Sequence, residues 1–127
     1  MNEEPPPMIT SQQVAGVLVI TIGESKIVEG AALESLWQAI EQAISGQTNQ
    51  RVVLDFSAVE LMSSESLGLL VKLYRDLAES GGRIVLCGVR EPIQKVFAVT
   101  RLDQLFRIAP NIEAAVRGAA SEGSPRP

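Results

Sequence analysis

Three serines lie close together in the segment Met62-Ser63-Ser64-Glu65-Ser66-Leu67-Gly68. A long run with helical periodicity follows this segment, so the serines are expected at the start of a helix. A serine hydroxyl there accepts a hydrogen bond from a free N–H group of the first turn, and any of the three could be this N-cap. One cap needs one serine. The surplus hydroxyls suggest a phosphoacceptor, because a phosphate at a helix start meets unpaired N–H groups and the positive end of the helix dipole.

Gly68 lies one turn into the same predicted helix, where a glycine costs roughly 1 kcal/mol relative to alanine. Close contact between the helix and a strand is the favoured explanation. A bare backbone surface that admits a partner is the other explanation.

The remaining residues offer little chemistry. The chain has no histidine and a single cysteine, Cys87, which excludes Ser-His-Asp and Cys-His nucleophiles, histidine-ligated metals and cysteine zinc sites. Cys87 and Trp37 are expected in the core, and Asp55 is expected in a turn rather than at a metal. Neither G-x-x-x-x-G-K nor G-x-G-x-x-G occurs. We therefore expect no catalytic residue, no metal and no cofactor.

The composition indicates one globular domain. The 127 residues are 46% hydrophobic and only 4% aromatic, so the core must be aliphatic. A net charge of −4 gives no electrostatic case for nucleic-acid binding. The start MNEEPPPM is not a signal peptide, and no apolar run is long enough for membrane insertion. A cytoplasmic protein is expected, with a domain at 8–117 between mobile tails at 1–7 and 118–127.

Two periodicities alternate along the domain. They predict an α/β fold: an open mixed, mainly parallel sheet of four to five strands with about four helices. The functional surface of such a sheet is the edge at the carboxyl ends of its strands, which here holds the loops 23–30, 57–63 and 89–91. Gly46 and Gly81-Gly82 are expected to end the first two helices. The predicted strands are 8–13, 17–22, 52–54, 84–87 and 105–108, and the predicted helices are 33–44, 64–80, 93–100 and 112–119.

These features resemble the STAS domain family, the fold of bacterial anti-sigma factor antagonists that is also found in sulphate transporter tails. The resemblance covers roughly residues 8–117. It implies that Ser64 is a phosphoacceptor, that the partner is an anti-sigma factor and serine kinase, and that a phosphatase resets the switch. The stretches that carry it are Gly23-Glu24, 52–59, 63–70 (usually D-S-S-G-L-G in the family) and 81–87, with 96–97 and 100–106 downstream.

The sequence departs from the family pattern beside the acceptor. Ser63 replaces the usual aspartate, Ser66 replaces the usual glycine, Glu65 adds a negative charge, and Lys26 stands where the family often has an acidic residue. An unswitched scaffold or accessory subunit of a stress-signalling or lipid-transport complex is therefore the alternative function, and an enzyme is the least favoured. A monomer or weak dimer is expected. The expected partner-binding residues are Glu24, Ser25, Lys26, Ser63, Ser64, Glu65, Ser66 and Gly68.

Overall fold

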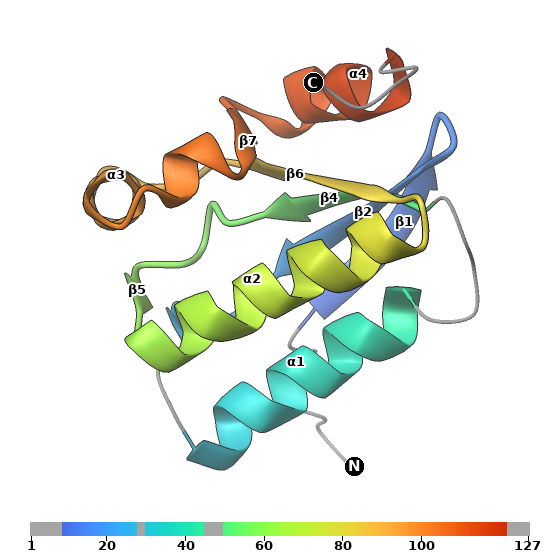
Figure 1. Cartoon of the computed structure of the whole chain (residues 1–127). Helices are drawn as coiled ribbons and strands as arrows, with labels where there is room; N and C mark the ends of the chain where they lie inside the picture. The colour runs from blue at the N-terminus through green and yellow to red at the C-terminus, as the bar shows by residue number, and fades with distance from the viewer. Residues whose placement is uncertain (1–8, 28–29, 45–49, 122–127) are drawn as a thin grey trace, which may run out of the picture.

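A five-stranded sheet forms the centre of the computed structural model, which describes residues 9–27, 30–44 and 50–121. Its order is β1-β2-β4-β6-β7, with β1 antiparallel to β2 and the other neighbours parallel (Figure 1). This confirms the predicted open mixed, mainly parallel sheet. The strands are β1 (Ile9–Val14), β2 (Val17–Ile22), β4 (Arg51–Asp55), β6 (Arg83–Cys87) and β7 (Arg107–Ala109).

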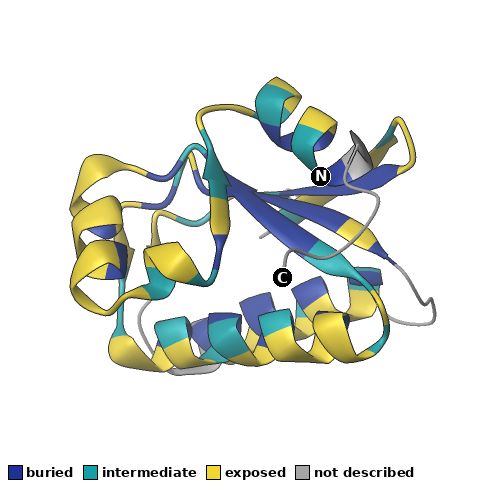
Figure 2. Cartoon of the chain, turned by 45° about the horizontal axis from the view of Figure 1, so that its top comes forward, coloured by how far each residue is buried: buried dark blue, intermediate teal, exposed yellow. Residues whose placement is uncertain are grey.

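Helices cover both faces of the sheet. Figure 1 shows α1 (Gly30–Ile44) and α2 (Ser64–Glu79) on one face and α4 (Ile112–Ser121) on the other. The short helix α3 (Glu91–Val99) lies beyond the end of the sheet at which β4 points. The helix faces turned toward the sheet are buried and the opposite faces are exposed (Figure 2). These two layers of helix explain why the central strands are apolar on both sides.

The core is mainly aliphatic, as the composition predicts, and also contains the buried rings of Trp37, Phe56, Phe97 and Phe106. Alternate residues of β2 serve different faces: Leu18 and Ile20 join the core beneath α1 and α2, whereas Val17 and Val19 join the core beneath α4. Each of these side chains is at least nine-tenths buried. Strand β4 is buried in the same way on both faces, which explains its unbroken run of apolar residues.

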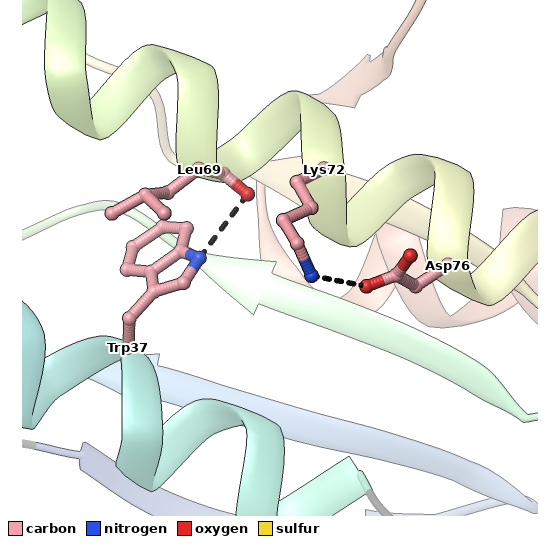
Figure 3. Close-up of polar contacts among 4 residues, drawn as sticks. All are labelled: Trp37, Leu69, Lys72 and Asp76. Atoms are coloured by element: carbon pink, nitrogen blue, oxygen red, sulfur yellow. Dashed lines mark hydrogen bonds and ion pairs between the residues drawn. The ribbon is translucent and has the colours of Figure 1, made fainter.

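Trp37 holds α1 against α2. The indole is 3% exposed, and its Nε1 donates a hydrogen bond to the Leu69 carbonyl oxygen at 3.1 Å (Figure 3). The expected role of Trp37 in the core is confirmed, and the hydrogen bond satisfies its only polar group. Nearby, the exposed pair of Lys72 Nζ and Asp76 at 3.0 Å spans one turn of α2, and because both groups are solvated it adds little to stability.

Two short strands were not predicted. Strands β3 (Lys26–Ile27) and β5 (Leu61–Met62) pair in parallel as a second, two-stranded sheet. Both lie inside segments that the sequence predicts as loops at the carboxyl edge. Two residues are too few to produce a periodic pattern, so the pairing depends on tertiary contacts.

Element boundaries differ near the C-terminus. The last predicted strand, 105–108, is displaced to β7 (Arg107–Ala109), because Phe106 instead packs edge-on against Tyr74 with ring centroids 5.4 Å apart. A 3-10 helix, η1 (Leu102–Gln104), precedes it. Helix α4 continues to Ser121, four residues into the segment expected to be a tail. The predicted tail at 1–7, the predicted helix end at Gly46 and residues 122–127 lie outside the described residues.

Gly81-Gly82 ends α2, as predicted. Gly81 has a φ of +83°, and its N–H donates to the Ala78 carbonyl at 3.1 Å. The Gly82 N–H donates to the Leu77 carbonyl at 2.7 Å, which completes a Schellman motif. Gly82 also lies against the backbone before β4, since a Cβ atom there would approach the Gln50 carbonyl oxygen to 2.5 Å. Position 82 therefore requires glycine because the Gln50 backbone lies too close for a side chain. Position 81 favours glycine because its backbone is left-handed.

We expect Gly82→Ala to lower the free energy of unfolding by about 1–3 kcal/mol, because backbone must move to admit the methyl group. Chemical denaturation in urea measures this. The matched control is Gly118→Ala in α4, where a Cβ would lie 3.8 Å from Arg107 and make ordinary contact. Equal unfolding free energies for Gly82→Ala and the unsubstituted protein would contradict the packing described here.

Candidate functional site

A reciprocal cap begins α2. Ser63 is the N-cap residue, with extended backbone angles (φ −102°, ψ 171°), and its hydroxyl accepts from the Ser66 N–H at 3.1 Å. In return the Ser66 hydroxyl accepts from the Ser63 N–H at 2.8 Å and donates to the Ser63 carbonyl at 2.8 Å. This capping box uses a serine where a glutamate or glutamine is usual. Two of the three serines are thus explained by the cap.

Ser64 is the remaining serine, and its environment is different. It occupies the first position of α2 and is exposed, whereas Ser66 is completely buried. Within the described residues, the Ser64 hydroxyl makes no hydrogen bond. The backbone N–H groups of Ser64 and Glu65 have no partner inside the helix, because first-turn N–H groups precede any helical acceptor. Ser64 therefore presents a free hydroxyl beside free backbone donors.

Glu65 is the other exposed group of this first turn. Its negative charge lies close to the positive end of the helix dipole, an arrangement that stabilises a helix by about 0.3–1 kcal/mol. The surface around Ser64 thus carries one carboxylate before any modification. The helix end also favours further negative charge, whereas Glu65 opposes it.

The β3–β5 pair brings two predicted partner-binding segments together. The Ser25 carbonyl accepts from the N–H groups of Glu60 and Leu61, at 2.7 and 3.0 Å, and Lys26 pairs with Leu61. Strand β5 leads directly into the Ser63 cap, so 24–26 lie beside the start of α2. Ser25 and Lys26 are exposed and Glu24 is half-buried. The sequence assigns both segments to one surface, but it gives no sign of the two strands that join them.

A largely apolar groove of about 420 Å³ adjoins Ser64. One wall comes from the end of β5 and the first turns of α2, and the other from α3 and the chain just after it. The sequence predicts a helix over 93–100, but none of its residues is among the predicted partner-binding residues. The lining residues are Met62, Ser63, Ser64, Leu67, Gly68 and Val71 on the first wall and Val96, Thr100 and Leu102 on the second.

Gly68 lies in this groove, and the favoured sequence-based explanation for it is wrong. A Cβ atom at Gly68 would have no neighbour within 4 Å, so no strand approaches it closely. The residue is exposed and lines the groove. The alternative explanation, a bare backbone surface open to a partner, agrees with the geometry.

The other candidate residues have structural roles. Asp55 is the last residue of β4 rather than a turn residue after it, and its carboxylate accepts from the Ser57 N–H at 3.0 Å, so it caps the loop that follows the strand. Cys87 is completely buried, and desolvation, aided by the negative charge of Asp55, raises the pKa of its thiol to about 12. Its assignment to the core is confirmed. The described residues hold no cluster of three or more potential metal ligands, and none of their helices could span a membrane.

Ser66 does not face outward with the other predicted partner-binding residues. Its hydroxyl is occupied by the cap and is not accessible. Ser66 contributes to this surface indirectly, through its hydrogen bonds to Ser63 at the start of α2. Of the predicted partner-binding residues, Ser25, Lys26, Ser64, Glu65 and Gly68 are exposed, and Ser63, Ser64 and Gly68 line the groove.

Known proteins of similar sequence and fold share this architecture. A Thermotoga maritima protein, named as a candidate anti-sigma factor antagonist, is 28% identical over 103 residues, covering 81% of this chain and 89% of its own. An anti-sigma-factor antagonist (STAS) domain protein from Planctomyces limnophilus superposes with a TM-score of 0.76 at 24% identity, covering 88% of this chain and 97% of its own.

The Bacillus cell fate determinant SpoIIAA is similar in two solved states. The phosphorylated form has a TM-score of 0.63 at 23% identity, covering 87% of this chain and 98% of its own. The unphosphorylated form has a TM-score of 0.71 at 21% identity, covering 91% and 99%. The family model described as STAS domain matches residues 8–115. With the fold, the capped serine segment and this match in agreement, the chain belongs to the STAS domain family.

Proposed function

We propose that this chain is a regulatory binding module of the anti-sigma factor antagonist type, switched at Ser64. It binds an anti-sigma factor that is also a serine kinase, and that kinase transfers phosphate to the Ser64 hydroxyl. A phosphatase restores the hydroxyl. The observation that carries the proposal is the free, exposed Ser64 hydroxyl at the start of α2, on the rim of an apolar groove.

The groove provides the docking contact. Its aliphatic walls, formed by side chains such as Leu67, Val71 and Val96, suit apolar side chains of a partner. Gly68 leaves backbone uncovered at the floor of one wall, which permits close approach. The exposed Ser25 and Lys26 lie beside β5, whose Met62 lines the groove, and supply polar contacts.

Phosphate at Ser64 opposes docking without unfolding the helix. A phosphoserine adds about −1.5 to −2 units of charge. The free N–H groups and the helix dipole stabilise that charge in the isolated protein. In the complex, the same charge would have to be desolvated against an apolar contact, which is unfavourable. The switch therefore acts on affinity and leaves the fold intact.

A second candidate function is favoured by Glu65. This exposed carboxylate gives the surface a permanent negative charge beside the acceptor. In this alternative the chain is an unswitched scaffold or accessory subunit, with a partner that tolerates charge at the start of α2. The two functions differ in their response to charge at Ser64.

We expect Ser64→Asp to weaken binding of the cognate anti-sigma kinase at least tenfold, or by about 1.4 kcal/mol. Ser64→Ala and Ser64→Asn are expected to bind within about threefold of the unsubstituted protein. Asn matches Asp in size and lacks its charge, so it separates electrostatics from crowding. Isothermal titration calorimetry measures the affinities. Equal affinity of the Asp and Asn variants would exclude the switch and leave the unswitched module.

We expect Gly68→Ala to stabilise the isolated protein by up to about 1 kcal/mol while weakening kinase binding, because the methyl group meets nothing in the protein and enters the groove. Gly118→Ala is the matched control, a helical glycine in α4 on the opposite face of the sheet. Thermal denaturation and calorimetry give the two readouts. Unchanged affinity in Gly68→Ala would show that the partner does not use the groove.

A further inference from the structure

Among the residues that the structure describes, the outer edge of β1 has no strand beside it, because β1 pairs only with β2. The strand is six residues long, Ile9 to Val14, and contains no charge and no proline. Its register with β2 runs without interruption from the Ile9–Ile22 pair to the Val14–Val17 pair, so no bulge twists the edge away. Charge, proline and bulges each protect edge strands from self-association, and β1 has none of the three.

The opposite edge of the same sheet is protected. Strand β7 has only three residues, begins with the exposed Arg107, and is followed directly by Pro110. Shortness, positive charge and proline each hinder the addition of another strand. The sheet therefore has one edge, β7, that is protected from pairing and one edge, β1, that is suited to it.

The hairpin defines which backbone groups of β1 point outward. Ala15 and Gly16 form a two-residue turn with positive φ angles of 54° and 80°, so Val14 and Val17 form a hydrogen-bonded pair. Hydrogen-bonded and non-hydrogen-bonded pairs alternate along an antiparallel ladder. Thr10, Gln12 and Val14 therefore bond to β2. The N–H and C=O groups of Ile9, Ser11 and Gln13 point toward the open edge.

We propose that this edge pairs with β1 of a second copy of the chain, antiparallel and centred on Ser11. Ser11 then lies opposite the partner's Ser11, and Ile9 lies opposite the partner's Gln13. The three outward residues of each copy satisfy one another through six backbone hydrogen bonds, two at Ser11 and four at the flanking pairs. The two sheets become one sheet of ten strands.

The uncharged composition of β1 favours a second copy over a different protein. A twofold pairing places residue 11 opposite itself, so a charge there would repel its own copy. A strand that selects a different partner gains specificity from charge, and β1 has none to offer. Because little apolar area is added to the six hydrogen bonds, the dimer is weak, with a dissociation constant of about 10–500 μM. This pairing shares no residue with the Ser64 site.

The test is sedimentation equilibrium of the full chain from about 10 μM to 1 mM. The unsubstituted protein is expected to dimerise, and Ser11→Lys and Ser11→Glu are each expected to be monomeric. An equimolar mixture of these two variants is expected to dimerise again, because residue 11 then faces an opposite charge. Gln38→Lys, on the exposed face of α1, is the control and is expected to dimerise normally.

Hydrogen exchange gives a second readout that does not depend on any substitution. The amides of Ser11 and Gln13 are expected to become protected as protein concentration rises, whereas those of Gln12 and Val14 are protected at every concentration. A monomer at 1 mM, or a dimer that persists in both Ser11 variants, would overturn the proposal. So would protection of Ser11 and Gln13 that does not change with concentration.

Discussion

The reciprocal hydrogen bonds between Ser63 and Ser66 are the interaction on which the site depends. They fix the residue at which α2 begins, and they occupy two of the three hydroxyls in the segment. Ser64 is thereby placed at the first helical position, where it is exposed and the backbone N–H groups of the first turn have no acceptor inside the helix. A helix that began one residue later would make Ser64 the N-cap residue and place Leu67, which has no polar side chain, at the third helical position. The cap therefore defines the chemistry of the surface as well as the helix boundary.

The rest of the fold holds this helix start in place. Trp37 ties α2 to α1 through the Leu69 carbonyl, five residues after Ser64, and Gly82 allows the far end of α2 to lie against the backbone before β4. The β3–β5 pair joins Ser25 and Lys26 to the segment that enters the cap. Because the core beneath α2 is apolar and closely packed, the groove beside Ser64 is an open surface feature rather than a defect in the core.

Much of the fold follows from the sequence because long elements carry strong periodic signals. The apolar runs of β2, β4 and β6, the stripes of α1 and α2, and the Gly81-Gly82 stop all specify their elements locally. The β3–β5 pair does not, since two-residue strands have no period. The last strand is displaced because Phe106 packs against Tyr74 instead of extending the sheet. These failures occur where tertiary contacts override local preference.

For the candidate site, the sequence predicts the helix start and its serines but not the geometry around them. Serines before a helical run indicate a cap, and the family resemblance singles out Ser64, but three equivalent hydroxyls cannot be ranked without knowing which one is buried. The prediction of close helix-to-strand contact at Gly68 is wrong, because a glycine in a helix also occurs where nothing lies close to it. The groove is formed partly by Val96, Thr100 and Leu102, more than twenty residues away, and no local pattern connects them to Ser64.

The central claim is that the cap leaves Ser64 as the only serine of the three able to accept phosphate. Tandem mass spectrometry of the full chain, after incubation with its anti-sigma kinase and ATP, tests it most directly. We predict a single phosphate within residues 63–66, located on Ser64. Phosphate on Ser63 or Ser66, whose hydroxyls the cap occupies, or a chain that stays unmodified while bound to the active kinase, would contradict it.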